Sequence, residues 1–188
     1  MGLVNKSIDC DFKINKIKEK EIDGVYFYKS GKVFMGGKVS RIKNLDEIPS
    51  PYLTGLLDKF FEKNLIPIIE TNRGCPYQCT FCCQGFSSFH QMHFFSMERV
   101  KSELEYISKH VKNTHILNLA DSNFGIVERD MEIAKFISEL NKRTGYPHVV
   151  SCNLAKNQPK IYELSKILNT LIVVSTDRKF KPTSTSKL

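Results

Sequence analysis

The sequence lacks any apolar run long enough to cross a membrane. Its longest largely apolar run, Leu65 to Ile69, is far shorter than the roughly 20 residues that a membrane-spanning helix needs. The N-terminal segment has no apolar stretch long enough for a signal peptide, and Lys6 stands where an N-myristoylation motif needs Ser or Thr. These absences disfavour membrane and secreted classes, and we expect a cytoplasmic protein.

The sequence also lacks tryptophan and any dense block of basic residues. Its 28 Lys and Arg against 20 Asp and Glu give a net charge of +8, which by itself suggests an anionic partner. The basic residues are dispersed, however, and no basic stripe interleaved with aromatic residues is present, as a nucleic-acid-binding surface requires. We therefore expect a solvated basic surface, and the sequence disfavours nucleic acid as a partner.

Cysteine is sparse except in one place. The chain has six cysteines, and four of them fall within nine positions. A secreted disulfide scaffold distributes its cysteines over a small domain, whereas clustered thiols in a reducing compartment indicate metal binding or catalysis. The clustered cysteines are Cys75, Cys79, Cys82 and Cys83, and the isolated ones are Cys10 and Cys152.

The first 64 residues have no regular alternation of strands and helices. Residues 1–23 show no clear period and are assigned no structure. The β-forming stretches 24–29 and 32–36 flank Ser30-Gly31 and predict a β-hairpin. After an irregular stretch, Ser50 is expected to cap a short helix beginning at Pro51. The apolar face of that helix would be Leu53, Leu56, Leu57, Phe60 and Phe61.

From residue 65 the pattern changes to strands alternating with helices. The helices are recognised by apolar residues at helical spacing, and Ser96 is expected to cap the first of them. An order of strand, helix, strand, helix predicts an α/β fold with a parallel sheet. The predicted strands cover 65–71, 114–120, 148–152 and 171–175, and the predicted helices cover 97–111, 129–142 and 159–168.

The clustered cysteines follow the first predicted strand directly. The segment reads Glu-Thr-Asn-Arg-Gly-Cys-Pro-Tyr-Gln-Cys-Thr-Phe-Cys from Glu70 to Cys82. Three thiolates within eight residues can ligate three irons of a cuboidal cluster, whereas clusters with purely structural or electron-transfer roles usually take four cysteines. A three-cysteine loop therefore leaves the fourth iron open to another ligand, such as the amino and carboxylate groups of S-adenosylmethionine.

A zinc site is the alternative interpretation of the same residues. Two or three of the thiols together with a nearby histidine could form a tetrahedral site. Zinc modules usually present paired ligands separated by a longer spacer, and here all the thiols lie in one loop. The candidate zinc ligands are Cys75, Cys79, Cys82 or Cys83, with His90 or His93.

The spacing Cys-x-x-x-Cys-x-x-Cys, with Phe81 before the last cysteine, resembles the signature of the radical S-adenosylmethionine (radical SAM) superfamily. In that superfamily the loop follows the first strand of a partial β/α barrel. Two further segments resemble its cobalamin-associated branch. Residues 44–58 are similar to the linker between its cobalamin-binding and radical domains, and Ala120-Asp-Ser-Asn-Phe-Gly125 is similar to its second-strand motif.

The resemblance implies roles for individual residues. Cys75, Cys79 and Cys82 match the ligands of a four-iron–four-sulfur cluster. Phe81 matches the position whose backbone contacts the adenine, while Asp121 and Ser122 match the strand end that helps to hold the methionine amino group. Asp121 could equally cap the loop beside its strand. No catalytic residue is assigned.

The chain departs from the family in two respects. No Asp-x-His-x-x-Gly motif for the lower ligand of cobalamin occurs, so cobalamin is expected only in full-length relatives. The stretch after residue 64 suffices for about four β/α units. We therefore expect an incomplete parallel (β/α) barrel. The expected domains are a hairpin and linker segment at 1–64, the partial barrel at 65–176 and a disordered tail at 177–188.

The function implied by the resemblance is reductive cleavage of S-adenosylmethionine to a 5′-deoxyadenosyl radical that acts on a small-molecule or peptide substrate. Such chemistry needs an electron donor such as a flavodoxin or ferredoxin. The alternatives are an inactive iron–sulfur-binding fragment and a zinc-binding nucleic-acid module.

Several other side chains have less specialised interpretations. Cys83, Cys10 and Cys152 are expected to be packed thiols. His115 and His148, near strand starts, are expected to be core or rim histidines. Glu70 could face the cluster or form a salt bridge with Arg73.

Overall fold

The structure is a computed structural model that describes residues 2–18, 22–37, 41–155, 160–168 and 173–174. It divides into two compact units, residues 1–43 and 44–188. None of the described helices is long and apolar enough to span a lipid bilayer. The predicted tail, residues 177–188, lies outside the described residues.

The first unit contains two helices, α1 (Gly2–Asp9) and α2 (Ile14–Ile17), and an antiparallel hairpin of β1 (Tyr26–Lys29) and β2 (Lys32–Met35). Ser30 and Gly31 both have positive φ, the conformation that a two-residue hairpin turn needs. Phe27 and Phe34 stack across the strands with ring centroids 5.3 Å apart. The hairpin prediction is confirmed, whereas the two helices were missed because residues 1–23 show no clear apolar period.

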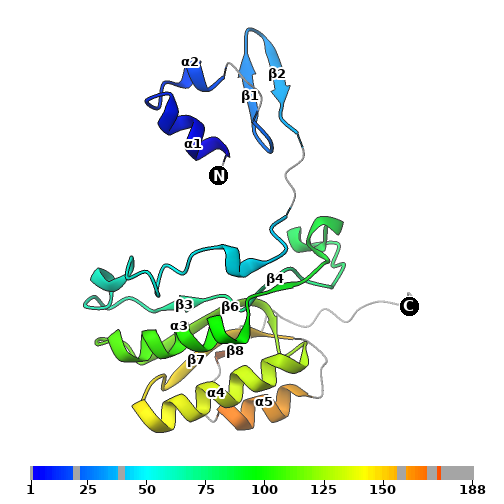
Figure 1. The fold of residues 1–188 in the computed structure, drawn as a ribbon. Helices are drawn as coiled ribbons and strands as arrows, with labels where there is room; N and C mark the ends of the chain where they lie inside the picture. The colour runs from blue at the N-terminus through cyan, green and yellow to red at the C-terminus, as the bar shows by residue number, and fades with distance from the viewer. Residues whose placement is uncertain (1, 19–21, 38–40, 156–159, 169–172, 175–188) are drawn as a thin grey trace. The chain divides into compact units, whose positions relative to one another are not determined.

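The second unit is built on a parallel sheet (Figure 1). Its strand order is β3-β6-β7-β8, and every neighbouring pair is parallel. One helix connects each strand to the next, and α4 packs against both α3 and α5. The bounds are β3 (Ile68–Ile69), α3 (Met97–His110), β6 (Ile116–Phe124), α4 (Glu128–Thr144), β7 (Val149–Leu154), α5 (Lys160–Leu168) and β8 (Val173–Val174).

This arrangement confirms the predicted α/β fold with a parallel sheet. Consecutive parallel neighbours joined by helices are βαβ units, whose crossovers are almost always right-handed and so bring the helices to one face of the sheet. Closure of the sheet into a partial barrel remains a prediction. Residues 171, 172 and 175 of the fourth predicted strand lie outside the described residues.

The predicted helices are confirmed, because the spacing of apolar residues identifies the buried face of each helix. Ser96 caps α3 by accepting a hydrogen bond from the Arg99 backbone amide at 3.1 Å. Val111, predicted on the same apolar face, is the half-buried C-cap residue of α3, and the other predicted apolar residues of both long helices are buried. They are Val100, Leu104 and Ile107 on α3, and Ile133, Ala134, Ile137 and Leu140 on α4.

The prediction of a short α-helix from Pro51 is wrong. The chain forms turns after Ser50 and then the 3-10 helix η2 (Asp58–Phe60). Ser50 does act as a cap in part, because its Oγ accepts from the Leu53 amide at 3.0 Å. Gly55, however, has φ +72°, which interrupts a right-handed helix. Leu53 and Leu56 are consequently exposed instead of sharing one buried face.

Residues 44–61 pack with the sheet unit through buried side chains and a polar network. Leu45 in the 3-10 helix η1 (Leu45–Glu47) is buried in the same core cluster as the residues of α3 and β6. The Glu103 carboxylate of α3 accepts from Ser50 Oγ at 2.5 Å and from Arg99 Nε at 2.6 Å. Arg99 also donates to the Ile48 carbonyl, so α3 holds this segment at several points.

The first predicted strand is shorter than expected. Only Ile68 and Ile69 pair with β6, and the chain then forms β4 (Asn72–Arg73), which pairs with β5 (His93–Phe94) in a separate antiparallel ribbon. The segment between β4 and β5 contains two 3-10 turns, η3 (Cys83–Gly85) and η4 (Ser87–Phe89). The cysteine segment is therefore a long loop whose two ends are joined by the pairing of β4 with β5.

Candidate functional site

The cysteine loop, residues 74–92, starts just beyond the carboxyl end of β3. Its ends are held together by the β4–β5 ribbon, in which Asn72 lies opposite Phe94 and Arg73 opposite His93. The Phe95 amide also donates to the Thr71 carbonyl at 3.1 Å. The carboxyl edge of a parallel sheet is where such folds usually carry their chemistry, so the loop is located at the expected edge.

The start of the loop is tightly constrained. Gly74 has φ +120°, and a Cβ at this position would lie 2.5 Å from the Gln91 carbonyl oxygen, so only glycine fits. The next amide, that of Cys75, donates to the Phe89 carbonyl at 2.9 Å. Cys75 is 7% exposed. The backbone therefore places the first cysteine in the interior of the site.

The other cysteines of the loop are more accessible. Cys79 is half-buried, and Cys82 and Cys83 are exposed. Two backbone hydrogen bonds turn this part of the loop. The Cys82 amide donates to the Cys79 carbonyl, and the Gly85 amide donates to the Cys82 carbonyl. The expectation that Cys83 is packed is wrong, because the 3-10 turn η3 leaves its side chain at the surface.

Asp121 on β6 is buried, at 1% exposure, and both of its carboxylate oxygens are used. Oδ1 accepts from the amides of Thr71 at 2.7 Å and Asn72 at 3.2 Å, and Oδ2 accepts from the Thr71 hydroxyl at 2.5 Å. Burial raises the pKa of this carboxyl from 3.8 to about 6, against the opposing effect of these donors. Asp121 thus caps the turn that leads into the cysteine loop, and any contact with a methionine amino group remains a prediction.

Asn123 on β6 contacts the first cysteine directly. Its side-chain amide nitrogen donates to Cys75 Sγ at 3.0 Å. Sequence reasoning did not identify this residue, although it lies within the second-strand motif and two positions after Asp121. In a strand, residues i and i+2 face the same side, which was the available signal.

Phe81 and Ser122 were also expected to contact the cofactor. Phe81 is 77% exposed on the loop, and Ser122 is half-buried on β6 between Asp121 and Asn123. The structure thus joins Cys75 to the end of β6 and leaves Phe81 at the surface. The cofactor contacts expected of Phe81 and Ser122 remain predictions.

The thiols of the loop are suitable in kind and number for a cluster that takes three protein thiolates, since none of them is in a disulfide. Among the described residues, no three His, Cys, Asp or Glu side chains are close enough together to hold a single metal ion. A tetrahedral zinc site needs sulfurs within about 4 Å of one another, given Zn–S bonds near 2.3 Å. A cuboidal cluster, which is ligated at separate corners, spaces its sulfurs more widely.

One of the two histidines proposed as zinc ligands has another contact, and the other is buried. A ring nitrogen of His90 lies 2.9 Å from the Gly85 carbonyl, which braces the loop internally. His93 is buried in β5. No observation on the described residues therefore favours the zinc interpretation.

The structure also shows the surroundings of four other residues whose roles the sequence predicted. Arg73 Nε lies 2.6 Å from Glu70 Oε2, so Glu70 forms the salt bridge that was one of its two expected roles. Cys152 is buried in β7, and burial raises the pKa of its thiol to about 12, as expected for an inert packed thiol. His115 and His148 stack on each other with centroids 4.6 Å apart near the starts of β6 and β7, as rim histidines.

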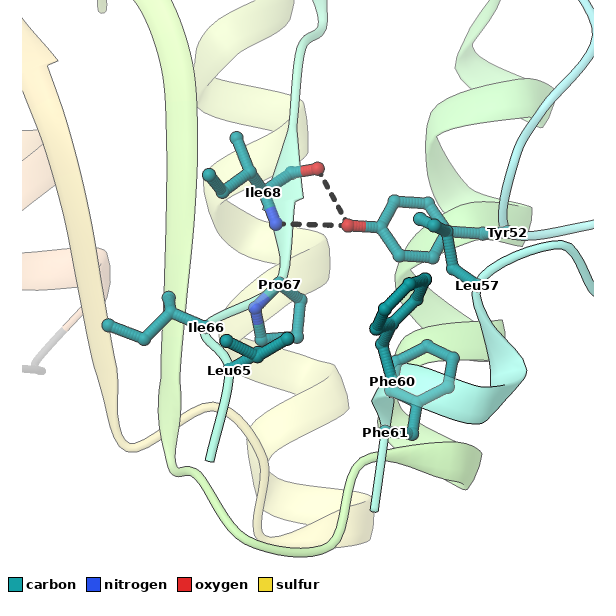
Figure 2. A pocket seen from close by; sticks show the side chains of 8 residues that line it. All are labelled: Tyr52, Leu57, Phe60, Phe61, Leu65, Ile66, Pro67 and Ile68. Carbon is teal, nitrogen blue, oxygen red and sulfur yellow. Dashed lines mark hydrogen bonds between the residues drawn. The ribbon is translucent and has the colours of Figure 1, made fainter. Parts of the chain in front are cut away.

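A separate apolar pocket of about 400 Å³ lies beside β3. Figure 2 shows its lining, in which Tyr52 and Phe61 face the residues that enter β3. The Tyr52 hydroxyl accepts from the Ile68 amide at 3.0 Å and donates to the Ile68 carbonyl at 2.8 Å. The lining contains no thiol, carboxylate or imidazole, so the candidate chemistry lies in the cysteine loop and not in this pocket.

Comparison with known proteins identifies two curated relatives of the chain. The chain is 36% identical over 152 residues to the cobalamin-dependent radical SAM methyltransferase TokK of Streptomyces tokunonensis. It is 34% identical over 152 residues to 2-(S-pantetheinyl)-carbapenam-3-carboxylate methyltransferase of Streptantibioticus cattleyicolor. Each alignment covers 77% of this chain but 22% of the relative, so the chain spans about a fifth of the length of these curated relatives.

The fold comparison agrees. The solved structure of the cobalamin-dependent S-adenosylmethionine radical enzyme OxsB superposes with a TM-score of 0.54 and 21% identity, covering 86% of this chain and 24% of that one. This likeness supports the fold. No protein-family model matches the chain. Over the part aligned with TokK, the chain is a homologue of a cobalamin-dependent radical SAM enzyme, and the resemblance that its cysteine motif indicates is confirmed.

Proposed function

We propose that this chain binds a four-iron–four-sulfur cluster through Cys75, Cys79 and Cys82, together with S-adenosylmethionine, as part of a radical SAM enzyme. The observation that carries the proposal is the loop itself. Three free thiols follow one another in a single loop at the carboxyl edge of a parallel sheet, and the first is held against the neighbouring strand. The two relatives reported above are named as methyltransferases, which makes methyl transfer the reaction class to test first.

When bound, such a cluster supplies one electron to the sulfonium of S-adenosylmethionine, and cleavage of a carbon–sulfur bond gives methionine and a 5′-deoxyadenosyl radical. The residues of this chain would bind and orient the cluster and S-adenosylmethionine. The three thiolates hold the cluster and leave one iron open. Asp121 fixes the turn before Cys75, the backbone at Phe81 would contact the adenine, and Ser122 lies at the strand end expected near the methionine amino group.

Other components of the reaction follow from the proposed class. The electron requires a low-potential donor protein such as a flavodoxin or ferredoxin, and the substrate is a small molecule or a peptide. One sequence relative and OxsB are named as cobalamin-dependent. We assign no described residue of this chain to cobalamin binding, and no step of the proposal depends on it.

Metal content after anaerobic reconstitution tests the proposal. We expect about four irons and four sulfides per chain. Cys79→Ala should abolish cluster binding, whereas Cys83→Ala, which removes a neighbouring exposed thiol, should leave the iron content unchanged. Equal iron content in wild type and Cys79→Ala, or stoichiometric zinc in place of iron, would contradict the assignment.

The second candidate function is cluster binding without turnover. It is the alternative because we assign a catalytic role to no described residue of this chain. Production of 5′-deoxyadenosine from S-adenosylmethionine in the presence of dithionite separates the two candidates. An active chain forms it in amounts that scale with cluster content, and a passive fragment forms none.

A further inference from the structure

The hydrogen bond from Asn123 to Cys75 connects the second strand of the sheet to the proposed cluster. Asn123 Nδ2 lies 3.0 Å from Cys75 Sγ, to which it donates. Cys75 is buried, so its sulfur has little access to water as an alternative donor. A thiolate at this position therefore depends on the donors that the protein supplies.

We propose that Asn123 is a positioning residue that orients the Cys75 thiolate and raises the reduction potential of the cluster. This inference rests on the function proposed above. An N–H group directed at a ligating sulfur stabilises negative charge there, and that charge increases when the cluster gains an electron. The bond is therefore stronger in the reduced state, and its loss makes reduction less favourable.

The surrounding contacts fix the start of the cysteine loop relative to β6, the strand that carries Asn123. Asp121, two positions earlier on β6, accepts three hydrogen bonds from Thr71 and Asn72. These contacts fix the chain three residues before Cys75 relative to β6. The strand therefore holds both the entry to the loop and the first thiol, and neither depends on an exposed side chain.

The test is a redox titration of the reconstituted wild type, Asn123→Leu and Asn123→Asp, followed by the EPR signal of the reduced cluster. Leucine is close in size and removes the donor, while aspartate keeps the shape and places negative charge beside the sulfur. Asn113→Leu is the matched control, because Asn113 also donates through its side chain, to the Glu62 carbonyl at 2.7 Å at an exposed site. Iron content is measured on each sample.

For Asn123→Leu we expect the one-electron reduction equilibrium to fall by up to about tenfold, the size of one hydrogen bond to a charged group. A tenfold change corresponds to about 59 mV for a one-electron couple. Asn123→Asp should fall further, and Asn113→Leu should match wild type. A purely structural role would lower iron content while leaving the potential of the remaining clusters unchanged.

The outcomes separate this inference from the proposed function. If wild type and both Asn123 variants load four irons with the same potential, the role of Asn123 is wrong and the cluster assignment stands. If wild type loads no iron–sulfur cluster, the proposed function is wrong and the inference is overturned with it. Circular dichroism of each variant identifies any that fail to fold, and the isosteric Asn123→Asp then decides.

Discussion

The two sides of the candidate site differ in the burial and the hydrogen bonding of their side chains. At the end of β6, Asp121 is buried with all its contacts made inside the protein, and Asn123 holds the buried Cys75. Across the loop, Cys82 and Phe81 are exposed. The sheet therefore holds one of the three cysteines of the proposed site, and the other side of the loop is exposed.

This contrast has a physical basis. A buried carboxylate must have partners because burial without them costs several kcal/mol, so the framework residues that surround such a group stabilise the fold together. An exposed thiol stays in contact with water, so it contributes little to the free energy of unfolding. Framework substitutions should therefore lower the stability of the metal-free chain, and loop substitutions should lower metal binding with little effect on stability.

The largest loss of stability should follow Glu103→Ala. Its carboxylate accepts from Ser50 and Arg99, and the Arg99 and Glu103 side chains are both largely buried. Removing one partner of a buried ion pair typically costs about 3 kcal/mol of unfolding free energy, because the remaining charge is left unpaired. Urea denaturation of the apo-protein measures this value.

Glu105→Ala is the control on the same helix, because the exposed Glu105 pairs with Arg143 at 3.3 Å. Such surface pairs contribute less than about 1 kcal/mol. Equal losses in the two variants would show that the network between α3 and residues 48–50 does not hold this part of the framework.

A pH-dependent difference of similar size should distinguish Asp121→Asn from wild type. The folded carboxyl, with a pKa of about 6, retains a proton that the unfolded chain loses near pH 4. Wild-type stability from this group is therefore greatest below pH 4 and falls by about 3 kcal/mol as the pH rises to 6. The amide variant lacks this fall, because the Thr71 hydroxyl can rotate to accept from it.

The measurement is unfolding free energy of both proteins at pH 4, 5, 6 and 7. Subtracting the two curves removes the contribution of every other titrating group. Parallel curves over this interval would mean that Asp121 is not a buried carboxyl.

A smaller effect is expected at the sheet edge. The register of β3 on β6 turns the Ile68 peptide groups away from β6, and the Tyr52 hydroxyl bonds to both. Tyr52→Phe should lower stability by about 1–2 kcal/mol, because the peptide groups lose a partner in an apolar surrounding. Tyr106→Phe, which loses only an exposed bond to Asp58, should change stability by less than about 0.5 kcal/mol. Similar losses would refute this role of Tyr52.

The smallest effect on the apo-protein is expected for Cys82→Ser. The side chain is exposed, so unfolding free energy should change by less than about 0.5 kcal/mol. Iron content after reconstitution should nevertheless fall sharply. A large loss of apo-protein stability would show that the exposed side of the loop belongs to the framework.

Parts of this molecule could be predicted from the sequence because they depend on local patterns. The faces of α3 and α4 follow from apolar periodicity, the hairpin from Ser30-Gly31, and the cysteine loop from its spacing after a strand. The Cys-x-x-x-Cys-x-x-Cys motif needs no tertiary information.

Other parts depend on contacts between residues far apart in the chain. β3 ends where the Thr71 amide donates to Asp121 of β6, fifty residues later in the chain, and the segment after Ser50 is held by the bond of Ser50 to Glu103 on α3. Asn123 acquires its role only when β6 lies beside the loop, 48 residues from Cys75. Propensity and spacing carry no information about such pairs.

The central claim is that the loop leaves one iron of its cluster open for S-adenosylmethionine. The most direct test is the EPR spectrum of the reduced, reconstituted chain before and after addition of S-adenosylmethionine. We predict a change in the spectrum at saturating ligand, because the open iron gains amino and carboxylate ligands. An unchanged spectrum from a fully loaded cluster would contradict the claim.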